Sequence, residues 1–186
     1  MRIVGGRHRG RRILAPPGEA VRPTSDRARE ALFNILSHGK YAAAGPPFAG
    51  ARVLDGFAGT GAIGLEALSR GASAAIFVER DRAALDALRR NIASLGETDR
   101  ARILAIDVTQ PPRTAEPCAL AFLDPPYQSG LAAPALAALA EAGWLGGGAL
   151  VVVELAAREA FAAPTGFSLI EERVYGAARL VFLRAP

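Results

Sequence analysis

The sequence predicts an α/β fold in which a mostly parallel sheet carries helices on both faces. Three observations support this prediction. Helical and β-prone segments alternate from residue 50 onward, the apolar runs have strand length, and a β-prone pair closes the chain. Hydrophobic residues make up 51% of the 186 residues, so the chain can form one domain of ordinary size with a substantial core.

The elements of the body follow one another with clear boundary signals. Gly71 ends the first helix, Asp81 is placed to cap the second, and Gly96 is placed to close it. The expected strands are 52–55, 74–79, 102–107, 120–124 and 149–154, with helices over 62–70, 81–95 and 131–142. Two more strands, 168–174 and 179–183, flank Tyr175-Gly176 and predict a closing antiparallel hairpin.

The first forty residues predict a separate unit. Residues 1–4 and 12–15 are β-prone and flank a Gly- and Arg-rich segment, which indicates a hairpin or a mobile arm with an Arg-loaded tip. A helix should follow, capped at Thr24, Ser25 or Asp26 and ended by His38-Gly39. We therefore expect an N-terminal hairpin and helix over 1–40, a linker over 41–50 and the main domain over 51–186.

Charge is concentrated at the N-terminus. Residues 1–29 hold eight Arg against Glu19 and Asp26, a net of +6, while the remainder holds 14 basic and 16 acidic residues, a net of −2, which together give +4. Forked guanidinium groups suit phosphate contact, so this cluster predicts binding to a nucleic-acid backbone. The alternative is a solvated basic tail.

Composition argues against several classes of protein. The N-terminus has no secretory pattern, and the longest apolar runs are too short to cross a bilayer. One cysteine, Cys118, allows no disulfide framework, and two histidines do not build a metal site of the usual kinds. We expect a soluble, cytoplasmic protein without a metal.

A glycine-rich loop lies between the first strand and the first helix. The spacing Gly59-x-Gly61-x-x-Gly64 matches the dinucleotide fingerprint, and Glu79 stands twenty residues after Gly59, where a ribose-binding acid belongs. By itself the loop fits either NAD(P) or S-adenosylmethionine. Asp55 favours the second, because a carboxylate at the end of the strand would oppose a pyrophosphate but suits an ammonium and a sulfonium.

Acidic residues also close the neighbouring strands. Asp55, Glu79, Asp107 and Asp124 each end one of four consecutive strands. Ligands of open α/β sheets bind outside the carboxyl ends of the strands, so we expect all four carboxylates at one rim. The alternative for each is a helix cap.

The segment Asp124-Pro125-Pro126-Tyr127 follows a buried strand and predicts a stiff turn. Proline fixes φ and carries no N–H, so neither helix nor strand continues through the pair. The turn holds a carboxylate, outward carbonyls and an aromatic ring close together, which is what a planar amine requires. The alternative is a structural turn with a half-buried tyrosine.

These motifs resemble those of known methyltransferases. The body resembles a class I S-adenosylmethionine-dependent methyltransferase, and D-P-P-Y resembles the motif of members that methylate exocyclic amines. The blocks at 2–14, 22–36 and 55–67 resemble the RsmD family, and the likeness runs from residue 1 to about 184. Arg80 departs from the apolar residue expected after Glu79.

The resemblance implies a Rossmann-like sheet of seven strands in the order 3-2-1-4-5-7-6, with strand 7 antiparallel. It implies methylation of N2 of a guanine in 16S small-subunit ribosomal RNA, with S-adenosyl-L-methionine as the methyl donor. The implied partner is that RNA within an assembling or assembled small subunit, and we expect a monomer with no membrane association.

The sequence and the resemblance together assign the site residues. The base-binding, catalytic turn is Asp124, Pro125, Pro126 and Tyr127. The cofactor-binding residues are Asp55, Gly56, Phe57, Ala58, Gly59, Gly61, Glu79, Arg80, Asp107, Val108 and Asp124. The RNA-binding residues are Arg7, Arg9, Arg11, Arg12, Arg22, Thr24 and Arg29, of which Arg29 has the alternative of a helix-surface ion pair.

Other functions remain open from the sequence. A nucleic-acid methyltransferase acting on adenine N6 would use the same turn, and a protein glutamine methyltransferase usually has Asn in place of Asp124. An NAD-binding oxidoreductase fits the glycine loop but leaves Asp55 and D-P-P-Y without a role. A silent RNA-binding module is a further alternative.

Overall fold

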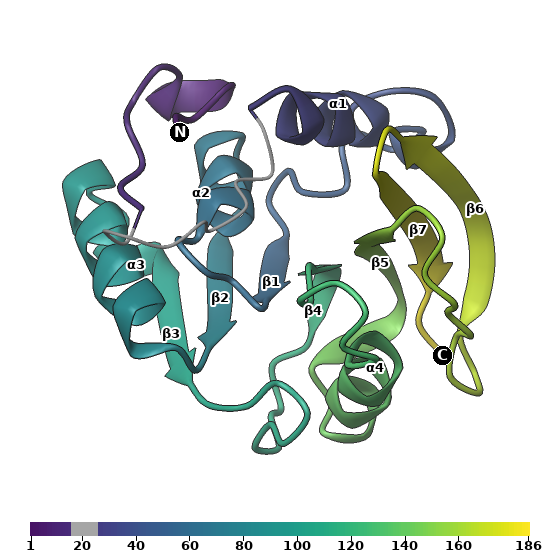
Figure 1. Cartoon of the computed structure of the whole chain (residues 1–186). Coiled ribbons are helices and arrows are strands. Elements are labelled where there is room, and N and C mark those ends of the chain that lie inside the picture. Colours follow the sequence, from purple (N-terminus) through teal and green to yellow (C-terminus); the bar gives the residue numbers. More distant parts are fainter. Residues whose placement is uncertain (16–25) are drawn as a thin grey trace.

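The computed structural model describes residues 1–15 and 26–186, and its centre is one mixed sheet (Figure 1). Within these ranges the sheet has seven strands in the order β3-β2-β1-β4-β5-β7-β6. All neighbours are parallel except that β7 runs antiparallel to both β5 and β6. The predicted order and orientation are confirmed. The strands are β1 (Arg52–Gly56), β2 (Ala74–Glu79), β3 (Ala101–Ala105), β4 (Cys118–Leu123), β5 (Leu145–Ala156), β6 (Ser168–Tyr175) and β7 (Ala178–Arg184).

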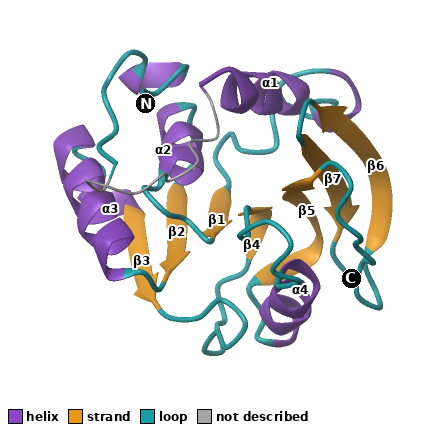
Figure 2. Ribbon diagram, in the orientation of Figure 1, coloured by secondary structure: helices purple, strands orange, loops and turns teal. Residues whose placement is uncertain are grey.

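Helices cover the two faces of the sheet unequally (Figure 2). Alternate strand residues point to opposite faces, so Val53 joins one hydrophobic cluster and Leu54 the other. The first cluster contains apolar side chains of three helices, and the second contains those of one helix together with Trp144. The helices of the first face are α1 (Asp26–Leu36), α2 (Ala62–Ser69) and α3 (Arg82–Leu95), and that of the second is α4 (Ala132–Glu141).

The predicted helix signals of the body are confirmed at α3. The Asp81 side chain accepts a hydrogen bond of 2.8 Å from the backbone N–H of Ala84, which satisfies one free donor of the first turn. Gly96 ends the helix in the left-handed conformation with φ 69°. The expected helix ends therefore agree with the structure to within a residue.

For the N-terminal segment the sequence left a hairpin or a mobile arm open, and the structure has a closed, hairpin-like loop. Residues 1–15 contain no paired strands but a single antiparallel bridge, Arg2 to Arg12, and a short 3₁₀ helix, η1 (Gly6–His8), between them. Further backbone bonds, such as Ile3 N–H to Arg11 O at 2.9 Å, keep the loop closed. Its backbone is pinned to the body rather than extended as an arm. Val4 N–H donates to Glu66 at 2.8 Å and His8 N–H to the Ser69 hydroxyl at 2.9 Å.

The N-terminal elements and residues 41–50 share the core of the sheet. Ile3 and Ile13 are buried in the first cluster with Phe33 of α1. Tyr41, at the end of η2 (Gly39–Tyr41), stacks on Phe182 of β7 with ring centroids 5.1 Å apart. Segments expected to be an appendage and a linker therefore contribute directly to one continuous hydrophobic cluster.

Buried ion pairs and hydrogen bonds attach the N-terminal loop and α1 to α2. Glu66 of α2 is fully buried and lies 2.6 Å from Arg70 and 3.6 Å from Arg29 of α1. Arg29 also donates to the carbonyl of Arg2 and lies 3.0 Å from Asp26. Breaking such a network would leave an uncompensated buried charge, so these contacts fix where the N-terminal loop sits.

No helix of the described residues is long and apolar enough to cross a membrane.

Close packing of α2 on β2 gives the first testable prediction. A Cβ on Gly64 would lie 2.3 Å from the Phe77 ring, so Gly64→Ala should destabilise the fold by about 1–3 kcal/mol despite the better helix propensity of alanine. Urea unfolding measures the effect. Gly147→Ala is the matched control, because its nearest neighbour is a Pro186 oxygen at 3.9 Å. Equal stability of the two variants would contradict the packing account.

Candidate active site

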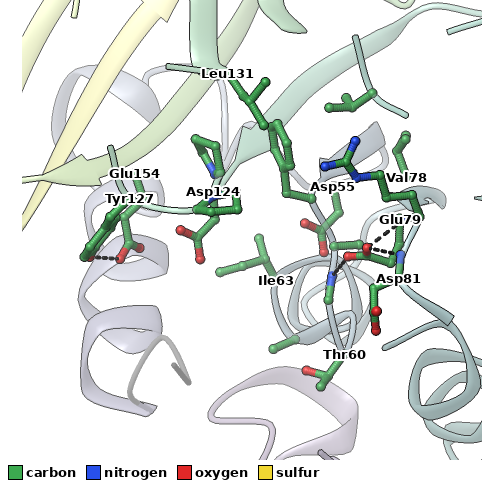
Figure 3. Close-up of a pocket in the computed structure, with 18 of the residues that line it drawn as sticks. Asp55, Thr60, Ile63, Val78, Glu79, Asp81, Asp124, Tyr127, Leu131 and Glu154 are labelled. Atoms are coloured by element: carbon green, nitrogen blue, oxygen red, sulfur yellow. Dashed lines mark hydrogen bonds between the residues drawn. The ribbon is translucent and has the colours of Figure 1, made fainter. Parts of the chain in front are cut away.

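One cavity of about 680 Å³ collects both predicted motifs at the carboxyl rim of the sheet (Figure 3). Its walls come from the loop after β1, the ends of β2 and β3, and the turn after β4. Predicted site residues that line it are Asp55, Phe57, Ala58, Gly59, Glu79, Arg80, Asp107, Val108, Asp124, Pro125, Pro126 and Tyr127. Gly56 lies within β1, and Gly61 precedes the first residue of α2 with φ 80°.

The pairing of β1 with β4 brings the two motifs together. The strands run parallel with Gly56 opposite Leu123, so the residues that follow each strand start at the same level. The backbone N–H of Asp124 lies 3.4 Å from the carbonyl oxygen of Gly56. The glycine loop and the Pro-Pro turn are therefore adjacent, as the sequence predicts for the ends of parallel strands.

The glycine loop is held by hydrogen bonds with residues of β2 and α3. Its Gly59 N–H donates to Glu79 at 2.7 Å, and Ala58 N–H donates to Val78 O at 3.0 Å. Asn91 of α3 is fully buried and donates to the carbonyl of Thr60 at 3.0 Å. These bonds fix the loop before any ligand arrives, which reduces the ordering cost of binding.

Glu79 is anchored by backbone donors. One oxygen accepts from Gly59, and the other accepts from the N–H groups of Arg80 and Asp81 at 2.7 and 2.8 Å. These three bonds fix the direction of the carboxylate. The geometry places a rigid acceptor at the end of β2, where the sequence predicts contact with ribose hydroxyls.

Asp55 is buried, at 3% exposure, and accepts a hydrogen bond of 2.8 Å from Gly64 N–H. Burial, together with the charges of Asp124 and Glu79, raises the pKa of Asp55 to about 8, although the Gly64 hydrogen bond opposes this rise. A cationic ligand beside Asp55 would favour its charged form and release this proton.

Arg80 has a partner that explains its departure from the expected apolar residue. It lies 2.6 Å from Asp107, whose other oxygen accepts from the Thr109 N–H and hydroxyl at 2.9 and 2.7 Å. The hydrogen bonds from Thr109, followed by the charge of Arg80, lower the pKa of Asp107. Arg80 and Asp107 thus act as a pair at the edge of the cavity where the adenine is expected.

Strained backbone marks both loops of the site. Within the described residues, Phe57 and Gln128 are the two non-glycine residues with positive φ, at 62° and 59°. Phe57 belongs to the glycine loop and Gln128 follows Tyr127. Left-handed backbone at a non-glycine residue costs of order 1–3 kcal/mol and collects at functional sites. The strain supports a binding role for both loops.

The predicted RNA-binding residues differ in their exposure and in their contacts. Arg9 and Arg12 are exposed, whereas Arg7 pairs with the buried Glu97 and Arg11 donates to Ser94 O at 2.6 Å. Arg29 is fully buried, so the expectation of direct RNA contact is wrong for it; its ion pairs with Asp26 and Glu66 explain the burial. Arg22 and Thr24 lie outside the described residues.

Sequence reasoning missed several residues that line the cavity. Glu154 is the most important, because it lies at the rim on β5 beside the Pro-Pro turn and its Oε1 is 3.3 Å from the Tyr127 hydroxyl (Figure 3). The signal was present, since Glu154 follows an apolar run as the other four acids do. Tyr175 of the β6–β7 hairpin and Ala28 of α1 also line the cavity. No sequence pattern points to either.

The comparisons with known proteins show the family of the chain. The model of the family described as "Conserved hypothetical protein 95" matches residues 1–184. Ribosomal RNA small subunit methyltransferase D of Escherichia coli strain K12 is 37% identical over 177 residues, covering 95% of this chain and 85% of the relative. The chain belongs to the RsmD family. It is a methyltransferase.

Two further relatives support the same family. The protein of the same name from Haemophilus influenzae is 34% identical over 180 residues, with coverage of 95% of this chain and 89% of the relative. The solved structure of yhhF from Escherichia coli matches with a TM-score of 0.82 and 37% identity, covering 100% of this chain and 97% of that one. Membership in the family disfavours the NAD-binding alternative.

The raised pKa of Asp55 gives a prediction about pH. Below about pH 8 a cationic cofactor has to displace the proton of Asp55, so its affinity should rise with pH, at most about tenfold per unit, and level off above pH 8. Asp55→Asn keeps an acceptor for Gly64 N–H and should flatten the profile. Calorimetric titration between about pH 6 and about pH 9 measures it. A wild-type affinity independent of pH would contradict the assignment of Asp55.

Proposed function

We propose that this RsmD-family methyltransferase transfers a methyl group from S-adenosylmethionine to N2 of a guanine in small-subunit ribosomal RNA. The observation that carries the proposal is the shared cavity, in which the glycine loop after β1 and the Asp124–Tyr127 turn after β4 face one space. Its two ends suit two different ligands. The acceptors at Asp55 and Glu79 suit the cofactor, and the turn suits the base.

The residues present fit this cofactor. Asp55 and Glu79 line the same cavity, and their oxygens suit the ammonium and the ribose hydroxyls of this ligand. The anchored Glu79 would accept from the ribose, and the Arg80–Asp107 pair with Val108 would border the adenine. When bound, S-adenosylmethionine supplies an electrophilic methyl group on a positively charged sulfur.

The Pro-Pro turn would prepare the target amine. Guanine N2 is a weak nucleophile because its lone pair is delocalised into the ring. Hydrogen bonds from the amine to the Asp124 carboxylate and the Pro125 carbonyl would favour a more pyramidal nitrogen, and Tyr127 would stack on a base turned out of its helix. Asp124 and the Pro125 carbonyl would thus hold N2 facing the methyl group that bound S-adenosylmethionine would supply. Alignment of this kind can be worth roughly 7–11 kcal/mol.

The exposed arginines of the N-terminal loop would hold the RNA backbone. Arg9 and Arg12 stay in solvent while Arg7 and His8 anchor the loop to Glu97. Burial opposes the effect, but hydrogen bonds from Arg7, His8 and Arg100 lower the pKa of Glu97, so it stays charged. The loop therefore presents its free cations from a fixed position.

The direct test is methyl transfer from labelled S-adenosylmethionine to small ribosomal subunits, naked small-subunit RNA and DNA, with digestion of the product to nucleosides. We expect N2-methylguanosine from RNA substrates, with the comparison of subunits and naked RNA showing which form is used. Label in N6-methyladenosine or in DNA would favour the adenine alternative and contradict the guanine assignment.

Asp124→Ala tests the amine-binding role. Removing the carboxylate should lower methyl transfer by about 10²–10³-fold, while cofactor affinity stays within a few-fold of wild type. Asp124→Asn is the control, since it retains one acceptor oxygen and should lose less. Single-turnover methylation and calorimetry give the two quantities. A variant that keeps most of its rate would contradict the role of Asp124.

The arginine loop gives a prediction about salt. Each phosphate contact contributes about 0.7 to the log–log slope of affinity against salt for single strands, so Arg9→Ala with Arg12→Ala should lower the slope by about 1.4. Filter binding at several salt concentrations measures it. Arg113→Ala is the control, because Arg113 is also exposed but lies in the loop between β3 and β4. An unchanged slope would show that the loop does not touch RNA.

A further inference from the structure

A second carboxylate, Glu154, lies on the neighbouring strand near Asp124. Strands β4 and β5 are parallel and their last paired residues are Leu123 and Val153, so Asp124 and Glu154 each follow directly after this pair. Adjacent strands lie about 4.8 Å apart, and residues in register point to the same face. Figure 3 shows both side chains at the Tyr127 end of the cavity.

Both groups are hydrogen-bond acceptors, and both line the cavity together with Tyr127. A ligand that presents two adjacent hydrogen-bond donors matches them, whereas a phosphate group carries acceptors and does not. The Asp124–Glu154 end of the cavity therefore suits the donor edge of a base rather than the RNA backbone.

Glu154 can accept from a base while it holds Tyr127. Its Oε1 receives the Tyr127 hydroxyl at 3.3 Å, and a carboxylate offers about four lone-pair sites on its two oxygens. It is half-buried, so a hydrogen bond made there is shielded from water once a base enters. The same contact keeps the Tyr127 ring near the turn that would bind the amine.

Guanine has the donor pattern that two adjacent carboxylates require. Its Watson–Crick edge carries the N1–H beside the N2 amine, whereas adenine and 2-aminopurine carry an unprotonated N1 beside their amines. An acceptor facing N1 therefore binds guanine and repels the other two bases. Sites that hydrogen-bond a polar group discriminate far more strongly than apolar pockets do.

We propose that Glu154 accepts a hydrogen bond from N1–H of the target guanine while Asp124 accepts from N2. Glu154 is thereby the residue that selects guanine over bases with an acceptor at N1. This inference rests on the proposed function, because it requires the Asp124 turn to hold the amine of a purine.

The test compares two RNA substrates that both carry a 2-amino group. One has guanine at the target position, and the other has 2-aminopurine, which keeps the amine but lacks N1–H. Wild type should prefer guanine by at least about 100-fold in kcat/KM. Glu154→Gln replaces an acceptor oxygen by an N–H donor of similar size, so it should lower the rate on guanine, raise the rate on 2-aminopurine and reduce the preference by at least about tenfold.

Tyr127→Phe separates base recognition from positioning of the ring. It removes the hydroxyl contact with Glu154 and should leave the preference for guanine within about twofold of wild type, even where both rates fall. If Glu154→Gln lowered the methylation rate equally on both RNAs and left the preference unchanged, the proposal would be overturned. A purely structural role for Glu154 lowers both rates together. If the wild-type protein did not methylate the guanine RNA at all, the proposed function itself would be overturned. The two failures are therefore distinct.

Discussion

The pairing of β1 with β4 is the constraint on which the site depends. The glycine loop and the Pro-Pro turn are about seventy residues apart in sequence, yet the parallel register and the Asp124 N–H to Gly56 O contact place them side by side. At this point the strand order of the sheet reverses direction, and open α/β sheets bind ligands at such a crevice. Any change that shifted this register would separate the cofactor end of the cavity from the base end.

The carboxylates around the cavity define its chemistry. Asp55 is buried with a raised pKa, and three backbone N–H groups hold Glu79 in place. Asp124 and Glu154 follow the paired residues Leu123 and Val153 at the other end. Such a set of acceptors suits a cation and a base rich in hydrogen-bond donors. The N-terminal arginines offer the opposite charge outside the cavity, which separates recognition of the backbone from recognition of the base.

Much of the fold was predictable because its signals are local. Short apolar runs ended by acids gave the strands, and the Asp81 cap and Gly96 gave the limits of α3. The family resemblance gave the strand order and the antiparallel β7. The four predicted acids all reached one cavity because parallel strands share a carboxyl edge. Glu154 carried the same local signal but was missed, since its importance depends on the β4–β5 register.

Contacts between distant parts of the chain were not predictable. Arg29 looked like a surface residue of an amphipathic helix, but its partner Glu66 is a buried residue of another helix. For the N-terminal segment the sequence could not decide between a hairpin and a mobile arm, because Glu97, which binds Arg7 and His8, lies about ninety residues away. Composition showed where the positive charge is concentrated, but not which arginines are already paired.

The most direct measurement is a crystal structure of the protein with S-adenosylhomocysteine and a short RNA that contains the target guanine. The account predicts the amino-acid end of the cofactor over the loop after Asp55, its ribose at Glu79, and the guanine amine between Asp124 and the cofactor sulfur. A cofactor bound outside this cavity, or a base held away from the Asp124–Tyr127 turn, would contradict it.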